Sequence, residues 1–390
     1  MTFRWLLTLS FILLSYPFTI TAHTASQVIT GAEQLDAYLP KLRNKNIAVI
    51  ANAASQVKGV HLVDILLKHG VIIKKILAPE HGFRGQKDAG EFDEDTIDTR
   101  TGIEIVSLYK QQSKRLTPSM LEGIDLVIFD IQDVGVRFFT YISTLHYVME
   151  ACVSCSKPLL LLDRPNPNAH YVDGPVLEKH VQSFIGMHPI PIVYGLTIGE
   201  LASMINEEGW LKDGLKCNLE IISLKNYTHQ TGYELPHKPS PNLANRQAVA
   251  LYPSLGLFEG TIMSVGRGTD YPFQVIGYPD KTWGNFNFIP VSIPGMATSP
   301  KYQDKQCYGL DLREVIPSSF IKLAYLLHFY KLAKEQNIPF FEKSFDLHAG
   351  HATLRQQIEA GLSEKEIRAS WQADLNRYKI LRKNYLLYPE

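Results

Sequence analysis

The amino-acid sequence predicts an α/β protein whose N-terminal half is built around a mostly parallel sheet. Between about residues 42 and 224, short β-like runs are apolar along nearly their whole length, as strands buried on both faces are. Helix-like stretches separate these runs, and such alternation is typical of βαβ units. After about residue 225, Pro, Gly and aromatic residues become frequent, which indicates a second domain.

The predicted elements of the first half alternate in chain order. Strands are expected over 45–52, 71–78, 103–109, 124–130, 157–163 and 218–224. Helices are expected over 61–70, 142–153 and 197–210, with a turn at 117–124. The last of these helices begins with Thr197 and has Glu200 three residues later, which is the spacing of a capping box. Beyond Pro317 the chain turns helical again over 318–336, 351–361 and 363–382. We place the domain boundary at about residue 235, so the two domains are 26–235 and 236–390.

The composition is that of an ordinary globular protein. Of the 390 residues, 45% are apolar and 20% are charged, with 39 basic and 39 acidic side chains and no long run of like charge. Neither a nucleic-acid partner nor binding to an anionic membrane is therefore expected. The four cysteines show no zinc-ligand spacing and are expected to be buried small apolar residues, with a Cys217–Cys307 disulfide left open as an alternative.

Residues 1–25 resemble a secretory signal peptide. Arg4 precedes an apolar run that Ser and Pro interrupt, and the small residues Ala22 and Ala25 follow it. An uncleaved N-terminal anchor is the alternative. No second long apolar stretch follows, so we expect an exported protein, periplasmic or secreted, whose mature chain is not stably inserted in a membrane.

Polar side chains follow four of the predicted strands, at the point where each strand ends. These side chains are Asn52, Ser55 and Gln56; Glu80, His81 and Arg84; Gln132, Asp133 and Arg137; and Arg164, Asn166 and Asn168. In an open parallel sheet the ligand crevice lies at the carboxyl ends of the strands, so these loops are where a site is expected.

Glu80 is the candidate general acid. It follows an apolar strand and Pro79, where desolvation would raise the pKa of its carboxyl toward the range useful for acid catalysis. Its neighbours also have structural alternatives: His81 as a hydrogen-bonded core residue and Arg84 as an ion-pair partner of Asp133. Asp130 and Asp163 could each cap a neighbouring helix.

Several common motifs do not occur. The sequence has no GxGxxG after its first strand, no Walker A motif, no GxSxG elbow and no HExxH. We therefore predict neither a cofactor nor a metal. Carboxylates, arginines, asparagines and many aromatic residues remain, and that set suits a sugar ligand because paired carboxylates cleave glycosidic bonds.

Successive blocks of the sequence resemble the bacterial exo-β-N-acetylmuramidase family, which was formerly a family of unknown function. The blocks are PEHGFRG (79–85), FDIQDVGVRFFTYI (129–142), LDRPNPN (162–168), GPVL (174–177), YGLTIGELA (194–202), KPSPNL (238–243), YPSLGLFEGTIMSVGRGTDYPFQVIG (252–277) and CYGLDL (307–312). The resemblance extends from about residue 45 to the C-terminal LLYP. One departure is Val265, where many relatives are expected to have a glutamate.

The resemblance implies a Rossmann-like domain, a smaller α+β domain and an active-site cleft between them. The implied reaction is hydrolysis of terminal N-acetylmuramic acid from the non-reducing end of peptidoglycan fragments, with muropeptides or disaccharides as substrates. Glu80 falls on the catalytic glutamate of the family. The other residues of matching blocks that are expected to bind substrate are His81, Arg84, Asp133, Arg137, Tyr141, Asn242, Glu259 and Arg267.

Arginines in the cleft would have a use in this reaction, because a guanidinium binds a carboxylate such as the lactyl group of N-acetylmuramic acid through two parallel hydrogen bonds. Two other functions stay open. One is a non-catalytic periplasmic protein that binds a muropeptide or sugar, and the other is an esterase or amidase acting on the cell wall. Release of free sugar from a disaccharide separates the glycosidase from the binding protein.

Overall fold

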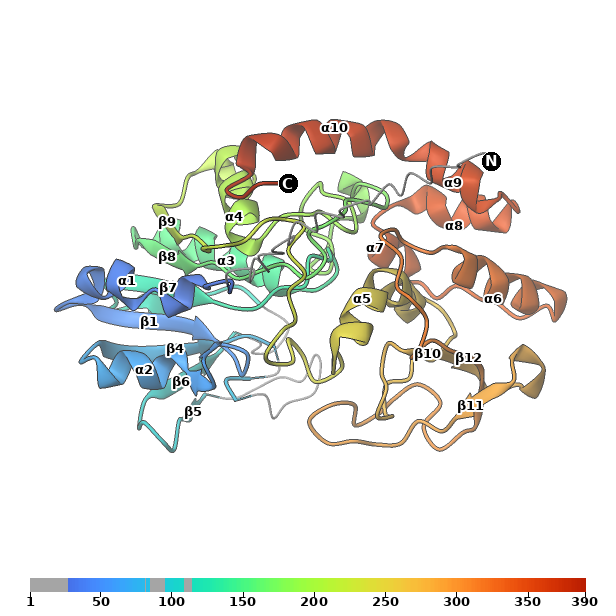
Figure 1. The fold of residues 1–390 in the computed structure, drawn as a ribbon, viewed down its shortest axis with the longest axis horizontal. Helices are drawn as coiled ribbons and strands as arrows, with labels where there is room; N and C mark the ends of the chain where they lie inside the picture. Colours follow the sequence, from blue (N-terminus) through green and yellow to red (C-terminus); the bar gives the residue numbers. More distant parts are fainter. Residues whose placement is uncertain (1–26, 81, 85–94, 109–113) are drawn as a thin grey trace, which may run out of the picture.

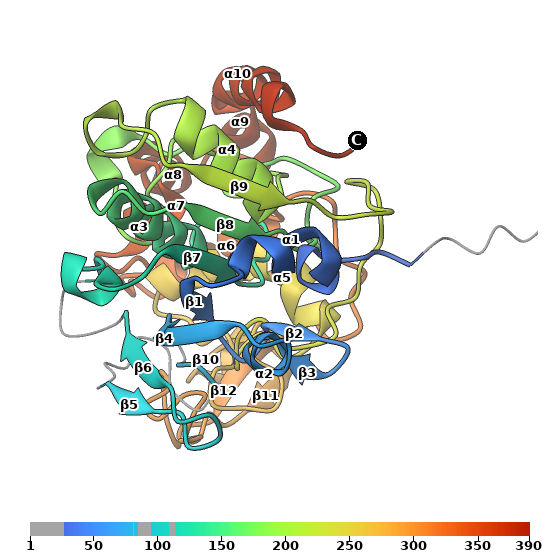
Figure 2. The same cartoon turned by 90° about the vertical axis from the view of Figure 1, so that its left-hand side faces the viewer.

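The structure, a computed structural model, describes residues 27–80, 82–84, 95–108 and 114–390. Its main sheet has the strand order β5-β6-β4-β1-β7-β8-β9 (Figures 1 and 2). The strands, in chain order, are β1 (Asn46–Ala51), β4 (Ile72–Ala78), β5 (Thr96–Ile97), β6 (Glu104–Ser107), β7 (Leu126–Asp130), β8 (Leu159–Leu162) and β9 (Leu219–Ile222). All neighbouring pairs are parallel except β5 with β6 at the edge. The order of the parallel strands is that of a doubly wound Rossmann fold, as predicted.

Alternate residues of the central strands face two apolar layers. On one face, Ile47 and Val49 of β1 share a cluster with α1 (Leu35–Leu42) and α2 (Leu62–Lys68). On the other face, Ala48 and Ile50 share a cluster with α3 (Tyr141–Ser154) and α4 (Ile198–Glu207). Helices therefore cover both faces, which explains why the strands are apolar along their whole length.

The C-terminal part contains a small antiparallel sheet with the order β10-β12-β11 (Figure 1). Its strands are β10 (Val275–Tyr278), β11 (Phe286–Phe288) and β12 (Cys307–Asp311). The helices of this part are α5 (Arg246–Leu255), α6 (Ala324–Glu335), α7 (Phe345–Ala349), α8 (Ala352–Glu359), α9 (Glu364–Ser370) and α10 (Gln372–Arg382). The predicted helical stretch 363–382 is thus two helices, which meet at Trp371.

Short elements complete the fold. They are the strand pair β2 (Gln56–Val57) and β3 (Val60–His61), and the 3-10 helices Gly31–Glu33, Pro118–Leu121, Lys179–Val181, Lys212–Gly214, Gly256–Gly260, Lys281–Trp283 and Lys383–Tyr385. None of the helices in the described residues is long and apolar enough to cross a membrane.

The C-terminal segment returns to the N-terminal sheet, as the path of α10 in Figure 1 shows. The hydroxyl of Tyr378 donates to the carbonyl oxygen of Tyr194 at 2.7 Å. The hydroxyl of Tyr388 donates to Oδ2 of Asp163 at 2.6 Å. The last residues of the chain therefore pack with the sheet domain, although they lie far from it in sequence.

The structure decides between several alternatives of the sequence analysis. Asp163 accepts hydrogen bonds from Thr197 Oγ1 and Gly199 N at the start of α4, so it does cap a neighbouring helix, and the Thr197–Glu200 capping box is present. Asp130 instead pairs with Arg164 at 2.6 Å.

The cysteine alternative is also decided. All four cysteines are free, and Cys217 and Cys307 belong to separate apolar clusters, so the structure does not contain a disulfide between them.

Candidate active site

The candidate site lies where the winding of the sheet changes direction, between β1 and β7. Ile50 of β1 pairs with Leu77 of β4 on one side and with Phe129 of β7 on the other. The carboxyl ends of these three strands are therefore adjacent, and Glu80 follows β4 by two residues. A ligand crevice is expected at this position of a doubly wound sheet.

Glu80 is held by the first residues of α3. Thr140 Oγ1 donates to Oε2 of Glu80 at 2.9 Å. The buried hydroxyl of Tyr141 accepts a hydrogen bond from Asn52 Nδ2 at 3.0 Å. The same hydroxyl lies 3.5 Å from the carbonyl oxygen of Glu80 and 3.4 Å from that of Pro239, so it can donate to either. The start of α3 thus positions both the carboxyl and the backbone of a half-buried glutamate.

Arg267 and Glu259 form an ion pair that contributes to the same site. Nε and Nη2 of Arg267 each lie 2.8 Å from Oε1 of Glu259. The side chains remain 27% and 22% exposed, respectively. Burial lowers the pKa of Arg267, but the charge and hydrogen bond of Glu259, together with Tyr252 and, with the smallest effect, Glu80, outweigh it, and the pKa is raised overall. Tertiary folding has therefore brought Arg267 within electrostatic reach of Glu80.

Asp133 and Asn242, two other predicted substrate-binding residues, are buried. Oδ2 of Asp133 accepts hydrogen bonds from the Tyr194 hydroxyl and, at 2.6 Å, from the Gly135 amide. Burial raises the pKa of Asp133 to about 7. Asn242 donates from Nδ2 to the carbonyl oxygen of Met296 at 2.7 Å. A direct role of either residue in substrate binding stays a prediction.

Arg137 is fully buried and forms contacts typical of a structural arginine. Its Nη1 donates to the carbonyl oxygens of Pro175 and Ile190, both at 2.8 Å, and its Nη2 donates to that of Ala349 at 2.5 Å. Burial lowers the pKa of Arg137 to about 9. Because Ala349 ends α7, these bonds join the loop after β7 to the C-terminal part of the chain.

Arg84 makes a bidentate ion pair at the edge of the sheet. Its Nε and Nη2 donate to the two carboxylate oxygens of Asp98 at 3.0 and 2.8 Å. The structural alternative for Arg84 had the wrong partner, since Asp133 bonds to Tyr194 instead. His81 lies outside the described residues.

The structure adds residues that the sequence analysis did not assign to the site. Asn52 contacts Tyr141 and Thr140 contacts Glu80. Asn52 follows a predicted strand and Thr140 lies in a family block, so both could have been found from the sequence. Lys114 is a further residue on which the charge of Glu80 acts, and no motif around it in the sequence indicated this. Burial lowers the pKa of Lys114, while the carboxylate of Glu80 raises it. The described residues include no group of three or more His, Cys, Asp or Glu arranged to hold a metal ion.

Comparisons with known proteins agree with this architecture. Residues 47–247 match the N-terminal domain model of the exo-β-N-acetylmuramidase NamZ, and residues 250–388 match its C-terminal domain model. A Bacillus subtilis relative, described as a peptidoglycan β-N-acetylmuramidase, is 35% identical over 95% of this chain and 96% of its own length.

Two crystal structures of DUF1343 family proteins from Bacteroides fragilis are also similar. One has a TM-score of 0.86 and 46% identity and covers 94% of this chain and 100% of its own. The other has a TM-score of 0.77 and 27% identity and covers 93% and 99%, respectively. With both domain models matched in order over most of its length, the chain belongs to the NamZ exo-β-N-acetylmuramidase family.

Proposed function

We propose that this glycosidase releases terminal N-acetylmuramic acid from the non-reducing end of peptidoglycan fragments, with Glu80 as the general acid. The observation that supports this most directly is the placement of Glu80. It lies at the carboxyl end of β4, is oriented by Thr140 and acts electrostatically on Arg267. The name of the Bacillus relative supports the class of substrate.

In this proposal the carboxyl of Glu80 protonates the glycosidic oxygen as the bond to the leaving sugar breaks. The hydrogen bond from Thr140 restricts the rotation of the carboxyl and so keeps its proton directed at one point. Glu259 supplies a second carboxylate near Arg267. The attacking group is a water molecule, a side chain or the N-acetyl group of the substrate itself, and all three fit a site of this kind.

Arg267 recognises the lactyl carboxylate of the muramic acid. Of the three arginines expected to bind substrate, Arg137 is fully buried, and Arg84 pairs with Asp98 beside the edge strand β5 through Nε and Nη2. Arg267 differs in its position, because it is partly exposed and the charge of Glu80 acts on it. Its bonds to Glu259 use Nε and Nη2. A carboxylate on the substrate can therefore bind the remaining nitrogen.

Export of the protein fits this role, because peptidoglycan lies outside the cytoplasmic membrane. We propose that residues 1–25 are a signal peptide and that the mature chain begins near residue 23–26. Sequencing the N-terminus of protein recovered from the periplasm or medium tests this, and a chain that still begins with Met1 would refute it.

The function is tested by incubating the protein with an N-acetylmuramic acid–N-acetylglucosamine disaccharide and measuring free N-acetylmuramic acid. Glu80→Gln keeps the shape of the side chain and removes its titratable proton. Its turnover should fall by about 10²–10⁴-fold, while binding of the disaccharide is retained. The loss should be smaller for a nitrophenyl muramide, whose leaving group needs little protonation.

Two outcomes would contradict the proposal. A wild-type protein that binds the disaccharide and releases no sugar would be a binding protein. A Glu80→Gln variant with full activity on the disaccharide would exclude Glu80 as the acid, and Glu259 or Asp133 would be the next candidates.

A further inference from the structure

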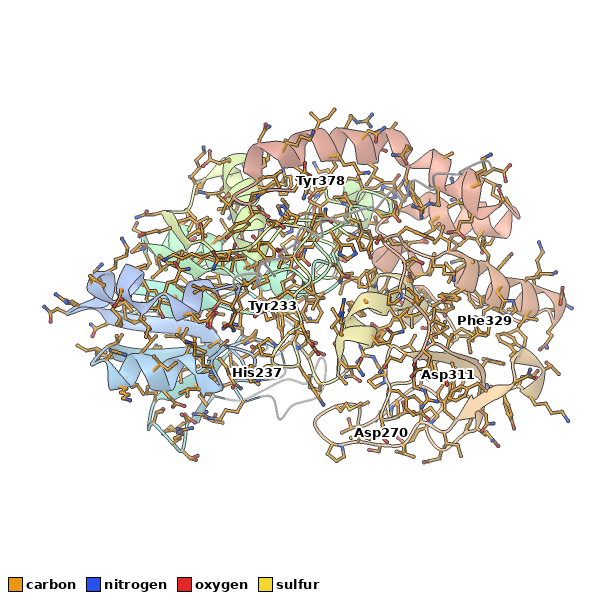
Figure 3. The ribbon with its side chains drawn as sticks, viewed as in Figure 1. Tyr233, His237, Asp270, Asp311, Phe329 and Tyr378 are labelled. Carbon is orange, nitrogen blue, oxygen red and sulfur yellow. The ribbon has the colours of Figure 1, made fainter. Side chains whose placement is uncertain are left out.

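A pocket of about 850 Å³ lies beside the candidate site. Its walls come from the loop after β8 (167–170), the segment that joins the two domains (230–239), the start of α5 (243–250) and residues 316–318. Figure 3 labels Tyr233 and His237, two of its lining residues, in the middle of the molecule. This volume is within the range of pockets that bind small organic ligands.

The pocket is separate from the candidate site but shares a wall residue with it. Glu80, Glu259 and Arg267 do not line the pocket. Pro239 does, and its carbonyl oxygen lies 3.4 Å from the Tyr141 hydroxyl, which is also 3.5 Å from the carbonyl oxygen of Glu80. The buried Tyr141 hydroxyl thus lies between the wall of the pocket and the backbone of Glu80, so the pocket and the candidate site are neighbours.

The charged side chains of the pocket favour an anion. Lys238 and Arg246 line it and are exposed, and neither forms an ion pair within the described part of the chain. Glu234 is the carboxylate in the lining. Burial and the nearby arginine charges lower the pKa of both His170 and His237, so both rings are neutral at pH 7. The lining thus carries two cations against one anion.

The other walls suit a peptide. Leu235, Leu243 and Val249 provide apolar surface, and Ile316 stands at the rim with 89% of its surface exposed. Asn245 and Gln247 also line the pocket, but Asn245 caps α5 and Gln247 donates to the carbonyl oxygens of Leu312 and Val315. A peptide offers aliphatic side chains to the apolar walls and carboxylates to Lys238 and Arg246, whereas a neutral sugar would leave both cations without a partner.

We propose that this pocket binds the carboxylate-bearing peptide of the substrate, carried on a second muramic acid in the leaving fragment. The inference rests on the proposed function, because the released muramic acid needs its own lactyl carboxylate free for Arg267. The peptide must therefore be attached beyond the sugar that is cleaved off. Lys238 and Arg246 pair with its carboxylates.

The test compares two substrates built on the same trisaccharide, N-acetylmuramic acid–N-acetylglucosamine–N-acetylmuramic acid. One carries an acidic tetrapeptide on its reducing-end sugar, and the other carries no peptide. For the wild-type protein, KM should be lower for the peptide-bearing trisaccharide. We define the ratio as KM without the peptide divided by KM with it. In the double variant Lys238→Ala/Arg246→Ala this ratio should fall about two- to tenfold, toward one. The wild-type ratio should also shrink in 0.5 M salt, because exposed ion pairs are screened.

Lys305→Ala is the matched control, since Lys305 is exposed on the C-terminal part and does not line the pocket. It should keep the wild-type ratio. Equal KM values for both trisaccharides in the wild-type protein, or an unchanged ratio in the double variant, would overturn the inference. If the bare trisaccharide releases no muramic acid, the proposed function fails instead. Calorimetry with the free tetrapeptide then still tests the pocket, with binding expected for wild type and at least twofold weaker for the double variant.

Discussion

The hydroxyl of Thr140 donates to Oε2 of Glu80 across 2.9 Å, which ties the N-cap of α3 to the loop after β4. The two residues lie in different family blocks and meet only because β4 and β7 flank β1. A carboxyl that is oriented in this way needs less reorganisation when it transfers its proton, because its rotation is already restricted before the substrate binds.

Thr140→Val should remove this bond and keep the shape of the side chain. We expect kcat for the disaccharide to fall about two- to tenfold with little change in KM, because a neutral hydrogen bond contributes about 0.5–1.5 kcal/mol. Thr140→Ser retains the hydroxyl and should restore most of the activity. If Thr140→Val lowers turnover of a nitrophenyl muramide just as much, the hydroxyl does not act through the acid.

Arg267→Ala should abolish discrimination between muramides and glucosaminides. Losing a charge-assisted bond to the lactyl carboxylate costs about 1.5–3 kcal/mol, so kcat/KM for the muramide should fall about ten- to a hundredfold. The glucosaminide has no such carboxylate, and its kcat/KM should change much less.

Arg267→Lys is the informative companion variant, because it keeps the charge but loses the planar donors, and it should restore only part of the preference. An equal loss of kcat/KM on both sugars in Arg267→Ala would show that the residue supports Glu259 or the fold rather than the lactyl group.

Arg137→Met should destabilise the protein rather than weaken substrate binding. The substitution leaves the carbonyl oxygens of Pro175 and Ala349 without the donor that the structure gives them, whereas that of Ile190 keeps its bond from the Leu177 amide. Unpaired buried acceptors are costly, so the free energy of unfolding in urea should fall by about 2–4 kcal/mol.

Arg115→Met is the control for this loss of a charge. Arg115 pairs with Glu150, but its side chain is 58% exposed, and such pairs contribute about 1 kcal/mol or less. If Arg137→Met left stability unchanged and raised KM for the disaccharide, Arg137 would bind substrate after all.

The stability of the protein should depend on pH through Asp133. Burial raises the pKa of its carboxyl to about 7 in the folded state, while an unfolded chain has an aspartate pKa of about 3.9. Between about pH 4 and 7 the folded state therefore holds a proton that the unfolded state has released. The stabilisation from this proton is complete below about pH 4 and is lost as the pH rises to about 7.

Asp133→Asn should make this pH dependence weaker. One such group changes the free energy of unfolding by at most about 1.4 kcal/mol per pH unit. Urea unfolding at pH 4.5, 5.5 and 7 measures the slope for wild type and variant. Asp163, whose pKa burial raises to about 6, contributes in the same direction and is present in both proteins. Parallel slopes for the two proteins would show that Asp133 does not take up this proton.

Much of the N-terminal domain could be predicted from local sequence alone. Apolar runs identified the strands, and polar residues after them identified the loops that hold Asn52, Glu80 and Asp133. The capping box of Thr197 and Glu200 also formed as expected. These features depend on side-chain periodicity and on hydrogen bonds between residues close in sequence, so a short stretch of chain contains the information for them.

The surroundings of the arginines were decided only by the tertiary structure. Arg84, Arg137 and Arg267 look equivalent in sequence, since each lies in a loop within a family block. Folding pairs the first with Asp98, buries the second among backbone carbonyls and leaves the third partly exposed near Glu80. Their partners come from segments distant in sequence, and burial depends on how the sheet, α7 and α10 pack together. A guanidinium can serve as a structural or a binding group, and only the surroundings created by that packing determine which one it is.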